Sequence, residues 1–391
     1  MESLSAESLM KHIWVLCKDL PPRQPTTVGE HQAAEYVEAE LGRLGVERRI
    51  ESFKGIPTLG LPAAIAVFIG LLAIPFGWTA FPSGKWIAAG LMALCGLTLY
   101  QLYANIPPFF TRLIERWESW NVIGQVKAAG EVKRQIYLLG HLDANKQRFL
   151  LPPTDPRLLK PSQTVSIVLP FFVALSFLLE LVPGWNLFWF QALAVAFLCV
   201  TAAMLAYDET QPTVEGANDN ASAVSILLGL AGALKKHPLQ NSQVTLLFSG
   251  CEEVGHHGLR AYLARHKPPV ENTYWIDLEL VGARNLCFAT RHGVTYVTQY
   301  RPGEGILRLA QATANKHPEL GVTGREMLIL EEVATLRQAG QNALCLMGYD
   351  EKGYLPFWHR VSDRLENLEP ETLARAARFS WELLQEIDAQ A

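Results

Sequence analysis

The sequence has few charged residues and no excess of positive ones. Only 18% of its 391 residues are charged, and the formal net charge is −4. Proteins that bind nucleic acids usually carry a basic surface, so this composition argues against nucleic acid as a partner. Hydrophobic residues make up 49% of the chain. That combination indicates membrane-embedded segments that dilute a soluble part.

Paired cysteines and a secretory signal are also missing from the pattern. The six cysteines show no paired spacing, and two of them, Cys95 and Cys199, lie in long apolar runs. Residues 1–25 contain acids and two adjacent prolines, and they lack a basic start, an apolar core and a small-residue cleavage site. A disulfide framework is therefore not expected, and the cysteine pattern fits a reducing compartment.

Four long apolar runs are present, and they form two pairs. Residues 55–84 and 86–111 contain no charge, and Lys85 separates them; residues 161–179 and 181–207 lie on either side of Glu180. Each run is about long enough for a helix that spans a bilayer, which needs roughly 20 residues. The sequence therefore predicts two transmembrane hairpins, 55–111 and 161–207, inserted into a soluble domain made of 1–54, 112–160 and 208–391.

The soluble part contains an apolar strand that ends in two acids. In SQVTLLFSGCEEVGHHG (242–258), the run 244–248 leads directly to Glu252 and Glu253. Parallel strands of α/β proteins present their sites at the carboxyl edge of the sheet. Adjacent carboxylates repel unless a cation lies near them or one is protonated. An isolated pair is more often a solvated loop feature, but a metal cluster is the alternative.

Other polar residues follow predicted strands or begin predicted helices. His141 ends the strand 134–140, and Asp143 two residues later could fix its tautomer. Asp219 lies where an N-cap belongs, so helix capping and metal ligation both remain open. Asp277 and Glu279 face the same side of the strand 273–282, because side chains alternate in a strand. His359 has an aromatic setting, where a structural role is more common than ligation.

Five of these segments together carry a resemblance to a known family. They occur in this order: HLD (141–143), GANDNASAV (216–224), EEVGHHG (252–258), DLELVG (277–282) and WHRVSD (358–363). This series resembles the M28 family of zinc peptidases, which includes bacterial aminopeptidases. The resemblance covers the soluble part and not the hairpins. It implies an α/β fold, a three-layer αβα domain with a mixed, mostly parallel sheet, to which the four transmembrane helices are added.

The resemblance also implies roles for individual residues. Asp219 would bridge two Zn²⁺ ions, His141 and Glu279 would complete one ion, and Glu253 and His359 would complete the other. Glu252 would be the general base, and Asp143 would orient His141. The peptide bond after the bridging aspartate is typically cis in this family, so the resemblance implies a cis bond between Asp219 and Asn220.

The sequence departs from the family pattern at three places. The ungapped match puts Glu279 on the ligand position and leaves Asp277 as an outer residue or alternate ligand. The segment 331–336 reads EEVATL where the family has S-D-H-x-x-F, which puts that outer contact in doubt. His256 and His257 have no family counterpart, and exposed loop positions are the expectation for them.

The hairpins restrict the topology independently of the family. If His141 and Asp219 meet at one site, the insert between them must cross the membrane an even number of times. The same holds for the first insert if 47–53 and 121–128 join one sheet. Lys and Arg are plentiful around the soluble domain, whereas the hairpin turns hold only Lys85. The positive-inside rule therefore predicts a multi-pass membrane protein with a cytoplasmic catalytic domain.

The sequence thus predicts a membrane-anchored dinuclear zinc exopeptidase, an aminopeptidase that acts on peptide substrates. Two alternatives remain open: a single-zinc enzyme similar to glutaminyl cyclases, and a non-catalytic M28-like membrane scaffold. Relatives of the scaffold kind lose ligand residues, whereas this chain keeps them. The lipid bilayer is the other expected partner.

Overall fold

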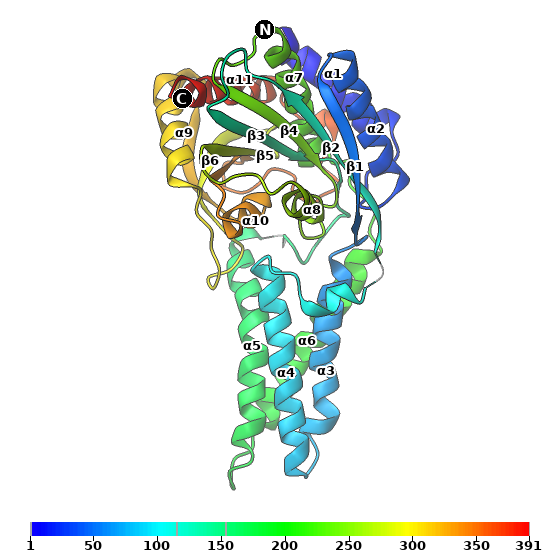
Figure 1. Ribbon diagram of the computed structural model, residues 1–391. Coiled ribbons are helices and arrows are strands. Elements are labelled where there is room, and N and C mark those ends of the chain that lie inside the picture. The colour runs from blue at the N-terminus through cyan, green and yellow to red at the C-terminus, as the bar shows by residue number, and fades with distance from the viewer. Residues whose placement is uncertain (1, 115, 153–154, 391) are drawn as a thin grey trace.

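The computed structural model describes residues 2–114, 116–152 and 155–390. An α/β domain lies at one end of a bundle of four long helices (Figure 1). Both ends of the described chain lie on the side of the domain that is far from the bundle.

The domain contains one eight-stranded sheet with the order β1-β2-β4-β3-β5-β8-β6-β7. The central pairs β4/β3, β3/β5 and β5/β8 are parallel, as is β6/β7, whereas β1/β2, β2/β4 and β6/β8 are antiparallel. This is the mixed, mostly parallel sheet that the resemblance implied. The strands are β1 Glu47–Gly55, β2 Trp117–Val126, β3 Arg134–His141, β4 Ser242–Ser249, β5 Thr273–Glu279, β6 Asn285–His292, β7 Val322–Met327 and β8 Ala343–Tyr349.

Helices cover both faces of the sheet because the central strands are apolar on both sides. Leu246 of β4 lies in the larger hydrophobic cluster, and its neighbour Leu247 lies in the smaller one on the opposite face. The larger cluster includes residues of α1 Ala6–Trp14, α2 Val28–Arg43, α7 Ser222–Lys236, α9 Glu304–Lys316 and α11 Pro370–Ala389. The smaller one includes residues of α8 His257–His266 and α10 Glu332–Gln338.

The four inserted helices are long and apolar enough to cross a membrane. They are α3 Gly60–Gly77, α4 Pro82–Tyr103, α5 Leu159–Leu179 and α6 Phe188–Glu209. Of the helix ends, only that of α5 at Leu179 coincides with the end of an apolar run. Helix α4 stops at Tyr103, ahead of Pro107 and Pro108, which lack the N–H that a continuing helix needs. Helix α6 continues two residues past the run, because Asp208 and Glu209 find partners in the domain.

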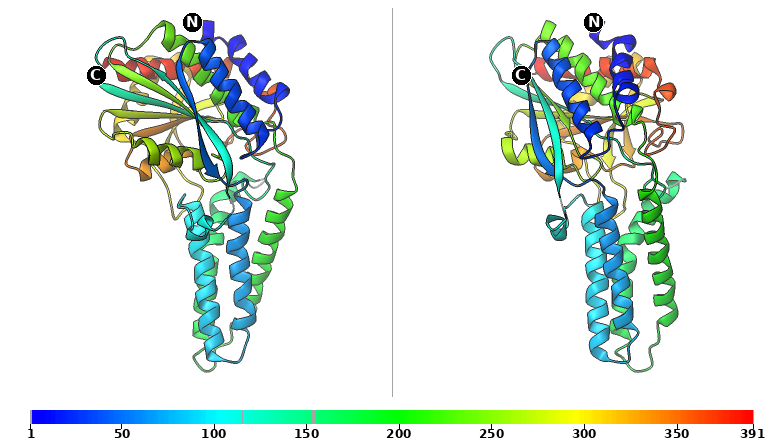
Figure 2. Two further views of the ribbon diagram at one scale, coloured as in Figure 1. Left: turned by 45° about the vertical axis from the view of Figure 1, so that its right-hand side comes forward. Right: turned by 90° about the vertical axis from the view of Figure 1, so that its right-hand side faces the viewer.

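Both hairpins return the chain to the domain (Figure 2). Strand β1 precedes the first hairpin and pairs with β2, which follows it. His141 precedes the second hairpin and lies 3.2 Å from Asp219, which follows it. Each hairpin thus begins and ends at the same domain, which is the condition under which an insert that spans a membrane must cross it an even number of times. At the far end of the bundle, Lys85 forms an ion pair with Glu180, which joins the two hairpin turns.

The carboxyl ends of β3, β4 and β5 meet at the sheet edge that faces the bundle. The strands are parallel, and His141 of β3 pairs in register with Ser249 of β4. After Ser249, the chain makes a turn in which Gly258 N–H donates to the main-chain oxygen of Gly250 at 3.0 Å. This turn carries the two adjacent glutamates, so its closure fixes where they lie.

Gly258 has no room for a side chain. A Cβ atom there would overlap the main-chain oxygen and nitrogen of Gly250 and the side chain of Asn121. Because main-chain atoms cannot rotate away, we expect Gly258→Ala to destabilise the protein by about 1–3 kcal/mol. The thermal unfolding midpoint of the detergent-solubilised protein measures this. Gly90→Ala in α4 is the control, since nothing lies within 4 Å of its Cβ position; equal midpoints for both variants would contradict the packing described.

Candidate metal centre

Three predicted ligands from distant parts of the chain come together at the sheet edge. The ligand atoms of His141, Asp219 and Glu253 all lie within 4.8 Å of one another. His141 is the last residue of β3, Asp219 lies just before α7, and Glu253 follows β4. The parallel register of β3 and β4 brings two of them together, and the packing of α7 on the sheet brings the third.

Asp219 lies between two histidines and contacts each with a different oxygen. His141 Nε2 lies 3.2 Å from Asp219 Oδ1 and 3.5 Å from Glu279 Oε2. On the other side, His359 Nε2 lies 3.6 Å from Asp219 Oδ2 and 2.9 Å from Glu253 Oε2. The five residues therefore form two histidine–carboxylate sets that share one aspartate.

Each histidine uses its other ring nitrogen on a main-chain oxygen. His141 Nδ1 lies 2.9 Å from the carbonyl oxygen of Asp143, and His359 Nδ1 lies 3.0 Å from that of Leu151. A carbonyl only accepts, so each Nδ1 carries the proton. The Nε2 atoms of both rings are thereby directed at the carboxylates. This is the tautomer in which a histidine ligates metal through Nε2.

The charges of the cluster favour a bound cation. Burial lowers the pKa of His141, but the carboxylates of Glu279 and Glu252 outweigh burial and raise that pKa well above its usual range. Three buried carboxylate oxygens, Asp219 Oδ2, Glu253 Oε1 and Glu279 Oε1, have no hydrogen-bond partner. Imidazole and carboxylate groups are common zinc ligands. The residues present thus fit divalent metal ions.

Glu252 lies beside the cluster and is held from its other side by His256. Glu252 Oε1 lies 3.2 Å from His256 Nε2, and Glu252 Oε2 lies 3.9 Å from His141 Nε2. Burial and the nearby carboxylates Glu279 and Glu253 raise the pKa of Glu252 well above its usual range. A cation near this carboxylate would oppose that shift.

The expectation that His256 and His257 are exposed loop residues is wrong. His256 is only 4% exposed, and its Nδ1 lies 2.9 Å from Thr335 Oγ1 of α10. His257 is half-buried as the first residue of α8. Thr335 and Asn105, whose amide also contacts His256, come from segments far away in the sequence. The doubled histidine in EEVGHHG was the only sequence signal for this contact.

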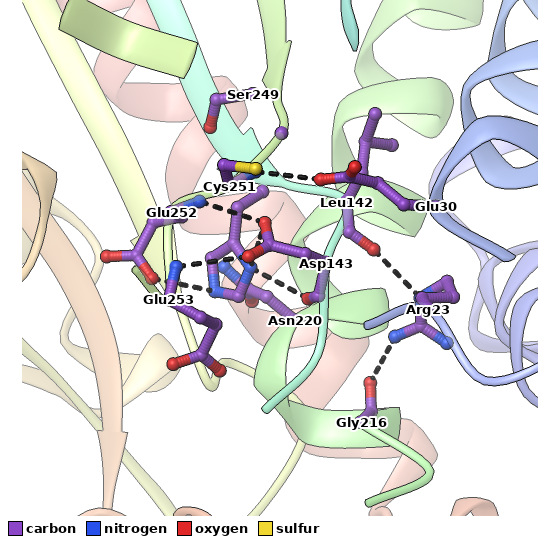
Figure 3. A network of polar contacts seen from close by, with 12 residues as sticks. Arg23, Glu30, Leu142, Asp143, Gly216, Asn220, Ser249, Cys251, Glu252 and Glu253 are labelled. Carbon is purple, nitrogen blue, oxygen red and sulfur yellow. Dashed lines mark hydrogen bonds and ion pairs between the residues drawn. The ribbon is translucent and has the colours of Figure 1, made fainter. Parts of the chain in front are cut away.

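Asp143 holds the two glutamates more directly than it holds His141. Its Oδ1 accepts from Glu252 N–H and its Oδ2 accepts from Glu253 N–H, both at 3.0 Å (Figure 3). The predicted contact with the His141 ring comes mainly from the main-chain oxygen, since the carboxylate lies 3.6 Å from Nδ1. The side chain therefore fixes the turn that carries both acids.

Two buried residues near the N-terminus, which the sequence analysis did not single out, hold the loops around the site (Figure 3). Arg23 donates from Nε to the carbonyl of Leu142 at 2.9 Å and from Nη2 to that of Gly216 at 2.8 Å. Glu30 accepts from Cys251 N–H at 2.8 Å, and burial raises its pKa to about 8. A lone arginine and a lone helical glutamate carry no motif, so the sequence offered no signal for either.

The segment around Asp219 is held by another acid. Asp363, the last residue of WHRVSD, accepts from Asn218 N–H at 2.6 Å and from Asp219 N–H at 3.0 Å. The bond between Asp219 and Asn220 is cis, as the resemblance implied. Helix α7 has its N-cap at Ala221, with no side-chain cap. The capping interpretation of Asp219 is therefore wrong, and its carboxylate faces the two histidines.

The other acids near the site lie behind the cluster. Asp277 is fully buried, and neither of its oxygens has a hydrogen-bond partner. Of the two β5 acids, Glu279 is the one that approaches His141. In the segment that departs from the family pattern, Glu332 accepts from Ser249 Oγ at 2.9 Å, and Glu331 lies 3.0 Å from His292 Nδ1. This segment therefore supplies buried carboxylates where the family has S-D-H.

A chain of polar contacts leads from the cluster to the end of α6. Asn145 Nδ2 donates to Glu253 Oε2 at 2.8 Å, and Asn145 Oδ1 accepts from Arg148 Nε at 3.0 Å. Arg148 Nη1 donates in turn to Glu209 Oε1 at 2.6 Å. Two side chains, Asn145 and Arg148, thus connect Glu209, the last residue of α6, to the predicted metal ligand Glu253.

Comparison with known proteins gives one family match. Residues 204–384 match the sequence model of peptidase family M28. No curated protein sequence matches the chain.

Solved structures with a similar fold include the following three. A Zn-dependent exopeptidase from Parabacteroides distasonis is 16% identical, with 98% of each chain covered and a TM-score of 0.55. A zinc aminopeptidase from Bacillus subtilis is 14% identical, with 98% of this chain and 95% of that chain covered and a TM-score of 0.58. The glutaminyl cyclase of Porphyromonas gingivalis is 14% identical, with 99% of each chain covered and a TM-score of 0.57.

Likeness at this level of identity shows the fold. The matched residues 204–384 include four of the five predicted ligands and Glu252, and His141 lies outside them. The chain therefore carries a segment that matches peptidase family M28, on the α/β fold of zinc-dependent exopeptidases, aminopeptidases and glutaminyl cyclases.

Proposed function

We propose that this protein is a membrane-anchored zinc aminopeptidase with two metal ions. The observation that carries the proposal is the sharing of Asp219 between two histidine–carboxylate sets, with Glu252 beside them. His141 and Glu279 would hold one Zn²⁺ ion, His359 and Glu253 the other, and Asp219 both. Two bound zinc ions would acidify a water molecule and polarise the scissile carbonyl.

The side chains around this centre have separate tasks in peptide hydrolysis. Glu252 accepts a proton from the attacking water as its oxygen bonds to the scissile carbonyl carbon, and it gives that proton to the leaving amine nitrogen as the C–N bond breaks. His256 limits the movement of Glu252 from the side away from the cluster. Asp143 fixes the main chain of both glutamates, so the distance between base and ligand stays constant.

A single-zinc, glutaminyl-cyclase-like enzyme is the second candidate, because glutaminyl cyclases are among the similar folds. The two candidates differ in the number of ions that the site holds. The approach of His141 Nε2 to both Asp219 and Glu279 supports a second ion. One zinc per chain together with a cyclised product would favour the cyclase.

The proposed domains follow the sequence division, with the peptidase part formed by 1–54, 112–160 and 208–391. The hairpins 55–111 and 161–207 anchor it. The distribution of Lys and Arg supports a cytoplasmic peptidase domain. In this arrangement the site lies on the cytoplasmic surface of the membrane.

Replacing the proposed base tests the activity. We expect the wild-type protein to bind two zinc ions per chain and to release N-terminal amino acids from short peptides. Glu252→Gln cannot take up the proton, so hydrolysis should fall by about 10²–10⁴-fold while zinc content stays at the wild-type level. Amino-acid release and elemental analysis measure the two quantities.

The exposed Glu271 provides the control, because Glu271→Gln makes the same chemical change far from the cluster. It should leave activity and zinc content unchanged. A zinc-free wild-type protein, or a Glu252→Gln variant with full activity, would refute the proposed function.

Removing the amide of Asn145 tests the support for the ligands. Asn145→Ala deletes the donor to Glu253, and outer contacts of this kind are worth roughly 10–100-fold in metal affinity. We expect zinc to be lost to a competing chelator at about 10–100-fold lower chelator concentration. Asn315→Ala on the exposed side of α9 is the control, and equal affinities in both variants would show that Asn145 has no part in holding the metal.

A further inference from the structure

The cavity that contains the metal centre continues into the helix bundle. One wall includes Asp219, Glu252, Glu253, Glu279 and His359. The opposite wall includes Ala63 of α3, Leu99 and Leu102 of α4, and Leu205 of α6. Ala63 lies three residues from the start of α3, and Leu99 and Leu205 lie four residues from the ends of their helices. The cavity therefore reaches about one helical turn, roughly 5 Å, along the bundle.

The two arginines that line this cavity, Arg148 and Arg260, already have hydrogen-bond partners. Arg148 is held by Glu209 and Asn145, and Arg260 donates to the carbonyl oxygens of Gly255 and Asn105. Among the described lining residues, neither arginine is left free to bind a phosphate or carboxylate group. The bundle side of the cavity is apolar, with Leu59, Pro62, Leu99, Leu102 and Leu205. It suits an uncharged, apolar group.

The position of the cavity bears on the direction from which an apolar group would enter it. The lining residues of α3, α4 and α6 all belong to the domain-proximal ends of helices that are long and apolar enough to cross a membrane. The cavity includes residues of the bundle helices, whereas both termini lie on the side of the domain far from the bundle (Figure 2). The cavity therefore has part of its lining in helices that are long and apolar enough to lie in a bilayer.

We infer that the substrates are apolar peptides with a free amino terminus, taken from the membrane surface, whose first side chains fill the space between the cluster and the bundle. This inference rests on the proposed aminopeptidase activity, which supplies the amino terminus. An aminopeptidase acts on a free amino terminus, which an N-acylated chain lacks. Burial of apolar side chains against Leu99, Leu102 and Leu205 supplies the preference.

Paired substitutions at neighbouring positions of α3 test this. Ala63 lines the cavity, whereas Ala64 is exposed on the outside of the bundle, so Ala63→Phe fills the cavity and Ala64→Phe adds the same ring outside it. The probes are leucine amide and two peptides that begin with leucine, one continued by polar residues and one by apolar residues. The full-length protein is assayed in phosphatidylcholine vesicles, and kcat/KM is measured for each probe.

We expect the wild-type protein and Ala64→Phe to favour the apolar peptide over the polar one. For the apolar peptide, kcat/KM of Ala63→Phe should be roughly tenfold or more below the wild-type value. For leucine amide, kcat/KM of this variant should equal the wild-type value. Because both variants face the same vesicles, simple partition of the peptide into lipid cannot produce this difference. Leu102→Gln, which makes the cavity wall polar, should repeat the loss, and the exposed Leu97→Gln on the same helix should not.

The outcomes separate the two proposals. If the wild-type protein does not hydrolyse leucine amide, the aminopeptidase activity itself is refuted. If it hydrolyses all three probes with equal kcat/KM, or if the four variants behave alike, the activity stands and the substrate class is wrong. Faster hydrolysis of an N-acylated leucine amide than of the apolar peptide would also overturn the inference.

Discussion

The contact on which the site depends is the carboxylate of Asp219, shared between the imidazoles of His141 and His359. The two histidines lie on chain segments separated by the second hairpin and most of the sheet. Neither segment is near the other in sequence, so only the folded domain brings them to one aspartate. Asp363 and Arg23 hold the loop that carries Asp219, and both are themselves buried. The geometry of the centre is therefore a property of the whole domain.

This arrangement has an electrostatic consequence for stability. Asp219, Glu252 and Glu279 are buried together. The Nε2 atoms of His141 and His359 are directed at the carboxylates. Burying carboxylates without compensating charge costs several kcal/mol per ion. Protonation reduces that cost, as the raised pKa values of Glu252 and Glu279 indicate. Divalent cations would oppose it while keeping the carboxylates ionised. A site of this kind links metal binding to the stability of the fold.

Hydrogen bonds at the same sheet edge connect the candidate metal centre to the helix bundle. Arg148 connects Glu209, at the end of α6, with Asn145, which contacts Glu253. One set of hydrogen bonds therefore positions both the end of α6 and a predicted ligand. The domain and the bundle also share a cavity. An anchor that served only to tether the domain would not need to contribute walls to its site. Under the substrate preference that we infer, the bundle would also take part in selecting the substrate.

Much of this could be read from the sequence, because periodicity and composition report on local structure. The apolar runs predicted the helical inserts, and the alternation in β5 put Asp277 and Glu279 on one face. The end of α6 was missed, since hydropathy does not register the partners that Asp208 and Glu209 find. The end of α4 was missed because Pro107 and Pro108 are uncharged and so did not interrupt the apolar run. His256 was misplaced for a similar reason: its burial depends on Thr335 and Asn105, which no local pattern connects to it.

The most direct test of the account is the anomalous X-ray scattering of crystals of the wild-type protein, measured on both sides of the zinc absorption edge. The account predicts two anomalous peaks, one between Asp219, His141 and Glu279 and the other between Asp219, His359 and Glu253. A single peak would contradict the shared role of Asp219. The absence of any peak at this cluster in zinc-supplied crystals would contradict the proposed chemistry as a whole.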